Sequence, residues 1–173
     1  MSAQAEFYPL NVAVLTVSDT RSTLNDTSGD KLCELAANAG HAIYERTLIK
    51  DDVYQMRAVV SKWIADRDVQ VILITGGTGF AGRDSTPEAI HPLLDKEING
   101  FGELFRWLSY KSIGTSTVQS RACAIVARGT YLFALPGSNG AVKDGWDGIL
   151  AEQLDSRNRP CNFVELMPRL TEK

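Results

Sequence analysis

Two features of the sequence predict an α/β fold with a mostly parallel sheet and one antiparallel edge pair. Short apolar runs typical of buried strands alternate with segments whose apolar residues recur at helical spacing. No internal repeat, low-complexity tract or linker interrupts this alternation. The 173 residues, 44% hydrophobic and 23% charged, suffice for one domain with a substantial core.

The first half of the chain is expected to contain three strands, each followed by a helix. Residues before about Leu10 are interpreted as a loose arm. The strands are predicted over residues 11–17, 42–49 and 71–75, and the helices over 26–39, 53–64 and 86–94. Thr27 and Asp30 form a weak capping box, whereas Thr86 is a good N-cap followed by Pro87 at the first helical position.

The second half begins with an amphipathic helix over residues 100–112 and a hydroxyl-rich break over 113–117. Two short apolar runs, 122–127 and 131–135, flank Arg128-Gly129 and predict a tight hairpin. A last helix covers residues 142–154, and the polar stretch beyond it is expected to be a surface tail or a segment packed on a partner. We therefore expect a single domain over 1–173, with its core at about 10–155 and a C-terminal tail at 156–173.

Composition excludes several classes of protein. The formal net charge of −3 gives no basic footprint for nucleic acid. No apolar run is long enough to span a membrane and no signal-peptide core is evident, so we expect a cytoplasmic protein without a membrane partner. Cys33, Cys123 and Cys161 are too few and too widely spaced for a disulfide framework or a zinc site. Neither His41 nor His91 has a nearby ligand partner, and neither is assigned a catalytic role.

The stretch over residues 71–88 has the pattern of an anion-binding site. A buried strand runs into a glycine-rich turn, then into Asp84, and then into the start of a helix. Glycines let backbone N–H groups approach a ligand closely, and a helix N-terminus adds partial positive charge, so the pattern favours phosphate. A carboxylate beside phosphate indicates a bridging cation, and we therefore expect Mg²⁺ near Asp84.

Other interpretations of the glycine-rich turn are open. Residues 77–82 match G-x-G-x-x-G, but two strands precede the motif and the acids about 20 residues further on follow a helix, unlike a dinucleotide fingerprint. The P-loop pattern fails because no Gly-Lys-Ser/Thr is present. The glycines could also serve only as a tight strand-to-helix turn.

Four polar clusters follow predicted strands and should meet at one edge of the sheet, where open α/β sheets bind ligands. The clusters are Ser18-Asp19, Asp51-Asp52, residues 76–84 and residues 136–139. Asp51 is either a metal ligand or a solvated acid, and Ser18-Asp19 could simply cap a turn. Ser120-Arg121 offers either a fixed cation for a second phosphate or an ordinary surface arginine.

Several short motifs are spread along the chain. They are Val17-Ser18-Asp19, residues 26–29, Thr75-Gly76-Gly77-Thr78-Gly79 with Asp84 and Thr86-Pro87-Glu88, residues 100–103, Ser120-Arg121 and Pro136-Gly137-Ser138. Together these motifs resemble the molybdopterin-binding MoaB/MogA family. The resemblance spans about residues 10–165, and residues 154–163 are similar to the MoaB branch. Each motif alone is unspecific, but their combination is specific.

The resemblance implies a three-layer α/β/α fold that binds molybdopterin and adenylylates it with Mg-ATP, releasing pyrophosphate. Asp51 and Asp84 match the catalytic, metal-associated pair. The resemblance assigns the nucleotide phosphates to Gly76, Gly77, Thr78 and Gly79, and assigns molybdopterin to Ser18, Asp19, Ser116, Ser120, Arg121, Pro136, Gly137 and Ser138. The alternative is a non-catalytic molybdopterin-binding or scaffold protein of the same pathway, which works with other molybdenum cofactor biosynthesis proteins.

A homo-oligomer is the last expectation. The helix over 100–112 is apolar on more than one face, because Trp107 and Tyr110 lie off its main stripe. Phe101, Phe105 and Phe163 lie in segments beside or beyond the predicted core elements. Large apolar patches tend to mark interfaces, and the resemblance implies trimers or hexamers. The alternative is that these aromatics cover a sheet edge within one subunit.

Overall fold

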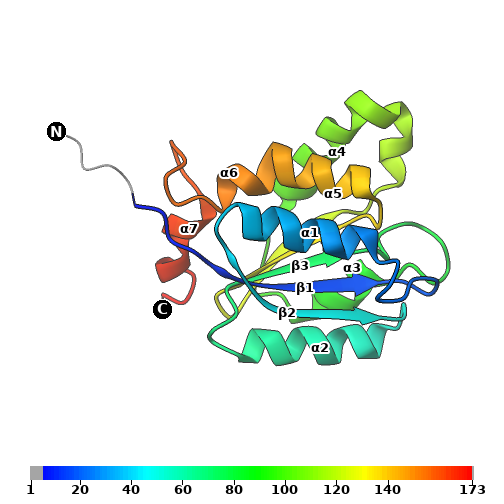
Figure 1. Ribbon diagram of the computed structural model, residues 1–173, viewed down its shortest axis with the longest axis horizontal. Coiled ribbons are helices and arrows are strands. Elements are labelled where there is room, and N and C mark those ends of the chain that lie inside the picture. Colours follow the sequence, from blue (N-terminus) through cyan, green and yellow to red (C-terminus); the bar gives the residue numbers. More distant parts are fainter. Residues whose placement is uncertain (1–5, 173) are drawn as a thin grey trace.

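A computed structural model describes residues 6–172 of the chain (Figure 1). Six strands form one sheet in the order β2-β1-β3-β6-β5-β4. Neighbours among β2, β1, β3 and β6 are parallel, whereas β5 is antiparallel to both β6 and β4. The strands are β1 (Asn11–Val17), β2 (Ala42–Ile49), β3 (Val71–Thr75), β4 (Lys96–Glu97), β5 (Cys123–Ala127) and β6 (Thr130–Leu135).

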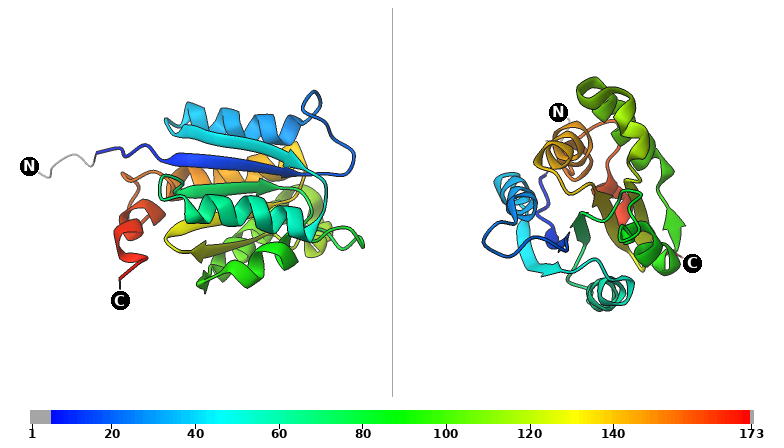
Figure 2. Two further views of the ribbon diagram at one scale, coloured as in Figure 1. Left: turned by 90° about the horizontal axis from the view of Figure 1, so that it is seen from below. Right: turned by 90° about the vertical axis from the view of Figure 1, so that its right-hand side faces the viewer.

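Helices cover both faces of the sheet, as the end-on view in Figure 2 shows. Helices α1, α4 and α5 pack on one face, and α2 and α3 pack on the other. The helices are α1 (Thr27–Asn38), α2 (Val53–Ala65), α3 (Thr86–Ile90), α4 (Asn99–Ile113), α5 (Asn139–Gly145), α6 (Ala151–Gln153) and α7 (Phe163–Leu166). Short 3₁₀ turns occupy His91–Leu93, Gly114–Gln119 and Met167–Arg169, and a π-helical segment, Trp146–Leu150, joins α5 to α6. The predicted α/β/α class with an antiparallel pair at one edge is confirmed.

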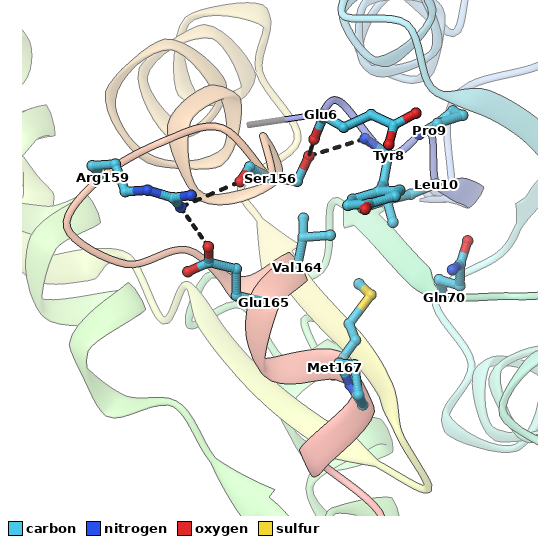
Figure 3. A pocket seen from close by; sticks show the side chains of 11 residues that line it. Glu6, Tyr8, Pro9, Leu10, Gln70, Ser156, Arg159, Val164, Glu165 and Met167 are labelled. Atoms are coloured by element: carbon cyan, nitrogen blue, oxygen red, sulfur yellow. Dashed lines mark hydrogen bonds and ion pairs between the residues drawn. The ribbon is translucent and has the colours of Figure 1, made fainter. Parts of the chain in front are cut away.

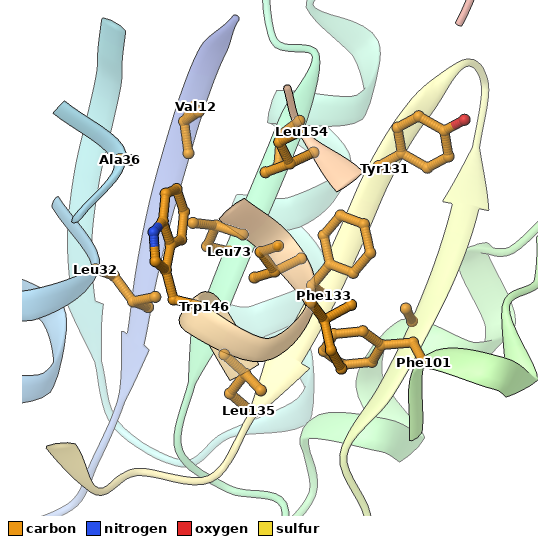
Figure 4. Packing of buried hydrophobic residues seen from close by; sticks show 14 of the residues in the cluster. Val12, Leu32, Ala36, Leu73, Phe101, Tyr131, Phe133, Leu135, Trp146 and Leu154 are labelled. Carbon is orange, nitrogen blue, oxygen red and sulfur yellow. The ribbon is translucent and has the colours of Figure 1, made fainter. Parts of the chain in front are cut away.

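The strands are apolar on both sides because each side faces a helical layer. In β1, Val12 and Val14 point into one core cluster while Ala13 and Leu15 point into the other. This is the near-continuous apolar run expected of parallel strands buried on both faces. Figure 4 shows the first cluster, in which Phe133 of β6 packs between helices. The two clusters hold the sheet, and with it the ligand edge, in a fixed position.

The predicted hairpin joins β5 to β6. Arg128 and Gly129 both have positive φ, +49° and +88°, which is the backbone of a tight two-residue hairpin turn. Strand β4 was not predicted, since its two exposed residues carry no apolar pattern. It adds to β5 and becomes the sheet edge, so β6 lies inside the sheet between β3 and β5.

The N-terminal segment that the structure describes packs on the domain, contrary to the expectation of a loose arm, and so does the C-terminal segment, which was expected to be a surface tail or to pack on a partner. Tyr8 N–H donates to Ser156 Oγ at 2.9 Å, and that hydroxyl donates to Glu6 O at 2.6 Å. The Tyr131 hydroxyl donates to Phe163 O at 3.0 Å, and the Phe163 ring packs 5.0 Å from the Tyr131 ring. Residues 1–5 of the predicted arm lie outside the described residues. The part of the tail near Phe163 therefore packs on its own subunit.

Two predicted helix caps shift by one residue. Helix α1 is capped by Asp26, whose carboxylate accepts from Gly29 N, instead of by Thr27. Ser85 occupies the N-cap of α3 without a side-chain cap bond, and Thr86 is the first helical residue. The Thr86 hydroxyl instead donates to Gly76 O at 2.8 Å. Thr86 thus ties the helix to the glycine-rich turn. None of the helices in residues 6–172 is long and apolar enough to cross a membrane.

Candidate functional site

The carboxyl ends of β1, β3 and β6 meet at one edge of the sheet. Strand β1 is followed along the chain by β2 on one side and then by β3 on the other, and ligands bind beside such a switch point. At this edge Gly76 N–H donates to Leu135 O at 2.9 Å. A Cβ on Gly76 would lie 2.0 Å from Val17 O, and one on Gly137 would lie 3.2 Å from Gly76 Cα. The floor of the site is therefore built from main chain packed against main chain.

The glycine-rich turn combines two different requirements for glycine. Gly76 and Gly77 have φ of +104° and +65°, which L side chains rarely adopt. Gly79 has no positive φ, but a Cβ there would lie 2.6 Å from Asp84 Oδ2. A Cβ on Gly77 would likewise lie 2.8 Å from Asp51 Oδ2. The turn thus needs glycine both for its backbone angles and for the carboxylates packed on it.

Asp51 and Asp84, predicted as a metal-associated pair, lie against the same turn. Asp51 is 9% exposed, and its Oδ1 accepts from the Ser85 hydroxyl at 2.7 Å. Asp84 Oδ2 accepts from Ala81 N–H at 2.8 Å. The second oxygen of each carboxylate has no hydrogen-bond donor among residues 6–172. Both acids therefore offer a free oxygen atom at the turn.

The charges in this region favour a cation. Burial of the Asp51 carboxyl raises its pKa, the hydrogen bond from Ser85 opposes the rise, and the charges of Asp84 and Asp19 add to it. A divalent cation beside these acids would offset both the burial and the repulsion. Two carboxylates with free oxygens are the donor set that Mg²⁺ takes when phosphates and waters complete its shell. Asp51 and Asp84 therefore fit Mg²⁺, although no group of three or more His, Cys, Asp or Glu that could hold a metal occurs among the described residues.

Asp19 and Ser18 belong to the loop after β1, and neighbouring backbone or charged groups fix both. Ser18 Oγ accepts from Thr20 N–H and Arg21 N–H at 3.3 and 3.2 Å. Asp19 accepts a two-point contact from the Arg83 guanidinium, at 2.6 and 2.8 Å. This contact lowers the pKa of Asp19. Apart from the position of Arg83 directly before Asp84, no sequence pattern indicates this ion pair.

Arg121 does not line the polar lobe but bonds to the backbone of the glycine-rich turn. Its Nε donates to Gly79 O at 2.8 Å, its Nη2 donates to Asp84 O at 3.0 Å, and its Nη1 pairs with Glu88. The contact with Arg121 lowers the pKa of Glu88. These bonds position the backbone on both sides of the turn. Contact of Arg121 with a phosphate or with molybdopterin stays a prediction.

Two cavities open at this edge and share a wall. The polar lobe, of about 430 Å³, is lined by Ser18, Asp19, Arg21, Asp51, Gly76, Gly77, Thr78, Gly79, Arg83, Asp84, Pro136, Gly137 and Ser138 among others. The hydroxyl lobe, of about 390 Å³, is lined by Thr78, Gly79, Phe105, Ser109, Ser112, Ser116, Ser120, Pro136, Ser138 and Asp144 among others. The two lobes share Thr78, Gly79, Pro136 and Ser138. Apart from Arg121, all predicted site residues therefore line one lobe or both.

Ser109 is one of several residues of the hydroxyl lobe that were not predicted. Ser109 of α4 is 3% exposed, and its Oγ has no hydrogen-bond partner among the described residues. A buried hydroxyl without a partner is costly, and a ligand in the lobe would satisfy it. Its position on the inner face of α4 resembles that of any small core residue, so the sequence alone does not single it out.

A third cavity, of about 660 Å³, lies at the opposite end of the sheet, between the N-terminal segment and α7 (Figure 3). Several of its polar side chains are already bonded: Arg159 pairs with Glu165, and the Ser156 hydroxyl bridges the backbones of Glu6 and Tyr8. None of the predicted site residues lines it. The chemistry-bearing side chains thus gather at the carboxyl edge of the sheet, away from this cavity.

Comparison with known proteins gives a consistent result. The family model described as "probable molybdopterin binding domain" matches residues 13–156. The chain is 54% identical over 158 residues to molybdenum cofactor biosynthesis protein B of Escherichia coli K12, covering 91% of this chain and 93% of the relative.

Solved structures agree. A crystal structure of molybdenum cofactor biosynthesis protein B superimposes with a TM-score of 0.85 at 36% identity, covering 96% of this chain and 98% of that one. A structure of MogA superimposes with a TM-score of 0.71 at 28% identity, covering 83% and 97% respectively. All residues that line the two lobes lie within the range 13–156 matched by the family model.

Proposed function

Because this chain belongs to the MoaB/MogA family of molybdopterin-binding proteins of molybdenum cofactor biosynthesis, we propose that it adenylylates molybdopterin with Mg-ATP and releases pyrophosphate. The observation that carries the proposal is the wall of four residues shared by the two lobes. Two substrates bound on either side of Thr78 and Gly79 would have their reacting groups adjacent. Holding both reactants in one geometry removes much of the entropic cost of a two-substrate reaction.

The polar lobe suits the triphosphate of ATP. Its glycine-rich turn presents backbone next to the carboxylates Asp51 and Asp84. These two acids would hold Mg²⁺, which would offset negative charge on the transferred adenylyl group and on the leaving pyrophosphate. Ser85 orients Asp51 through its hydrogen bond, and Arg121 fixes the backbone of Asp84. The role of these residues is to bind the metal and position the phosphates, as expected for transfer of a phosphorus-centred group.

The hydroxyl lobe suits molybdopterin. Its serines offer donors and acceptors, and the unpartnered Oγ of Ser109 supplies a group that a polar ligand would satisfy. In the reaction, an oxygen of molybdopterin attacks the α-phosphorus of ATP. The new oxygen–phosphorus bond forms while the bond to the bridging oxygen of the β-phosphate breaks, and pyrophosphate leaves with that oxygen. Ser116, Ser120 and Ser138 are proposed molybdopterin contacts.

Pyrophosphate release tests this function. The protein is incubated with molybdopterin and Mg-ATP, and pyrophosphate is measured. Asp84→Asn and Asp51→Asn are each expected to abolish pyrophosphate release while the variants stay folded. Asp68→Asn, an exposed acid in the turn before β3, is the matched control and should retain release. Wild-type activity in Asp84→Asn would refute the role of Asp84.

The same experiment distinguishes the alternative function. A protein that binds molybdopterin without releasing pyrophosphate is a non-catalytic binding or scaffold protein, which would act with other molybdenum cofactor biosynthesis proteins. The intact pair Asp51 and Asp84 favours catalysis, because a buried Asp51 carboxylate that is repelled by the neighbouring Asp84 is costly in a protein that only serves as a scaffold. We propose the cytoplasm as its location and a single domain over residues 1–173 as its functional unit.

We also propose a homo-oligomer assembled through α4 and the following turn, residues 114–119. Large apolar side chains there are 41–73% exposed: Leu104, Trp107, Tyr110, Ile113 and Val118. Such a patch is unusual on a monomer. Phe101 and Phe105, by contrast, are buried in the core and take no part. Light scattering at micromolar concentration is expected to give a trimeric or hexameric mass, and a monomeric mass would contradict the proposal.

A further inference from the structure

The polar lobe is lined by more carboxylates than arginines. Three carboxylates, Asp19, Asp51 and Asp84, line it together with two arginines, Arg21 and Arg83. A triphosphate would add further negative charge, which a cation from the protein would offset together with a metal. The existing contacts of Arg21 and Arg83 show which of the two can turn toward a phosphate.

Arg21 is anchored. Its Nη2 donates to Gly137 O at 2.8 Å, and its Nη1 lies 3.4 Å from the carboxylate of Asp26, which is 1% exposed. Nη1 also donates to Ser28. Moving this guanidinium would remove a cation from the buried Asp26 carboxylate and a donor from the buried Ser28 hydroxyl, which is unfavourable. Arg21 therefore ties the loop after β1 to the turn after β6.

Arg83 is held only weakly. It contacts both oxygens of Asp19 and, at 2.9 Å, Asp51 O. The side chains of the Arg83–Asp19 pair are 66% and 36% exposed, and exposed ion pairs contribute little stability. Arg83 Nη1 has no hydrogen-bond partner among residues 6–172. The guanidinium can thus exchange Asp19 for a stronger ligand at small cost.

The backbone next to Arg83 has room to adjust. Residues 80–83 are exposed, and a Cβ on Gly82 would meet nothing within 4 Å. The preceding residues, 76–79, are fixed by contacts with Val17, Thr86 and Asp84. The site therefore combines a rigid glycine-rich floor with an arginine on an open loop tip.

We propose that Arg83 is a specificity-determining residue for the polyphosphate tail of a nucleoside triphosphate, with Asp19 holding its guanidinium until the phosphates replace that carboxylate. This inference rests on the proposed function. The planar guanidinium fork binds phosphate with the same two-point geometry that it uses on Asp19. A nucleoside monophosphate lacks the tail, binds without this exchange and leaves Arg83 on Asp19.

The test compares ATP with AMP by isothermal titration calorimetry in the presence of Mg²⁺. Arg83→Ala is expected to weaken ATP binding about tenfold or more and AMP binding about twofold at most, since charge-assisted bonds to phosphate are among the strong ones. Arg67→Ala is the matched control, because it removes the same charge from an exposed position at the other end of the sheet. It should leave both affinities unchanged. Thermal unfolding verifies that each variant is folded.

Asp19→Asn tests the exchange itself. The neutral amide releases the guanidinium, so ATP should bind a few-fold more tightly, with no gain in Asp19→Asn combined with Arg83→Ala. Weaker ATP binding by Asp19→Asn, or equal losses of ATP and AMP in Arg83→Ala, would overturn the inference. Unchanged ATP binding by Arg83→Ala also overturns it while leaving the proposed function intact. A wild-type protein that binds neither nucleotide would refute both.

Discussion

The substitution Gly77→Ala probes the link between the glycine-rich turn and the acid beside it. The methyl group would lie 2.4 Å from Thr86 Oγ1 and 2.8 Å from Asp51 Oδ2, at a residue with φ of +65°. Thr86 is fully buried, and its hydroxyl bonds to Gly76 O at 2.8 Å. To make room, Thr86 must give up that bond, and Asp51 must move away from the turn.

The size of the effect follows from these contacts. A non-glycine residue in the left-handed region costs about 1–2 kcal/mol, and a lost hydrogen bond costs about 0.5–1.5 kcal/mol. We expect Gly77→Ala to lower the free energy of unfolding by about 2–3 kcal/mol. For a domain of this size, the melting temperature should fall by roughly 5–10 °C.

Differential scanning calorimetry measures the shift against Gly82→Ala in the same loop. That control has open space at its Cβ and no positive φ, so its melting temperature should match the wild type. Equal melting temperatures for the two variants would show that the turn relaxes around the new methyl group and that our reading of Gly77 is wrong. Mg²⁺-dependent ATP binding should also weaken in Gly77→Ala, because Asp51 has moved.

Three further predictions concern other parts of the site and its surface. The pKa of Asp51 is raised in the folded protein, so the stability of the wild type should fall as the pH rises from the ordinary carboxyl pKa toward the raised one. Asp51→Asn should therefore have a higher melting temperature than the wild type at pH 7, and this difference should vanish at acid pH. A difference in melting temperature that does not depend on pH would contradict the prediction. Ser109→Ala should weaken molybdopterin binding in a titration without lowering the melting temperature, because its buried hydroxyl has no partner in the described chain; a clear loss of stability would argue against a ligand-facing role. Trp107→Glu should reduce the mass measured by light scattering to that of a smaller assembly, and an unchanged oligomer would exclude this face of α4 as the contact.

The strands and the positions of the acids could be predicted from the sequence because each depends on local pattern. The apolar runs fixed the strands, and the carboxyl ends of parallel strands necessarily share an edge, which brought Asp51 and Asp84 together. Strand β4 was missed, since a two-residue exposed edge has no pattern of its own.

What the sequence could not provide is the direction of long side chains. Arg83 and Arg121 both lie near the glycine-rich turn, yet one faces Asp19 in the cleft and the other bonds to the backbone behind the turn. Such choices depend on tertiary neighbours that no local pattern encodes. The same holds for Phe163, which looked available for an interface but packs against Tyr131 of its own subunit.

The contact of Gly76 with Val17 and Gly137 has a consequence for how such a protein diversifies. Because main-chain atoms of Gly76, Val17 and Gly137 pack directly on one another in the floor of the cleft, substitutions of exposed side chains on the rim leave that packing in place. Variation can then accumulate on the rim, in residues 19–25 and 80–83, where side chains are largely exposed. Proteins that share this main-chain floor can therefore come to select different ligands through substitutions on the rim alone, while the fold stays the same.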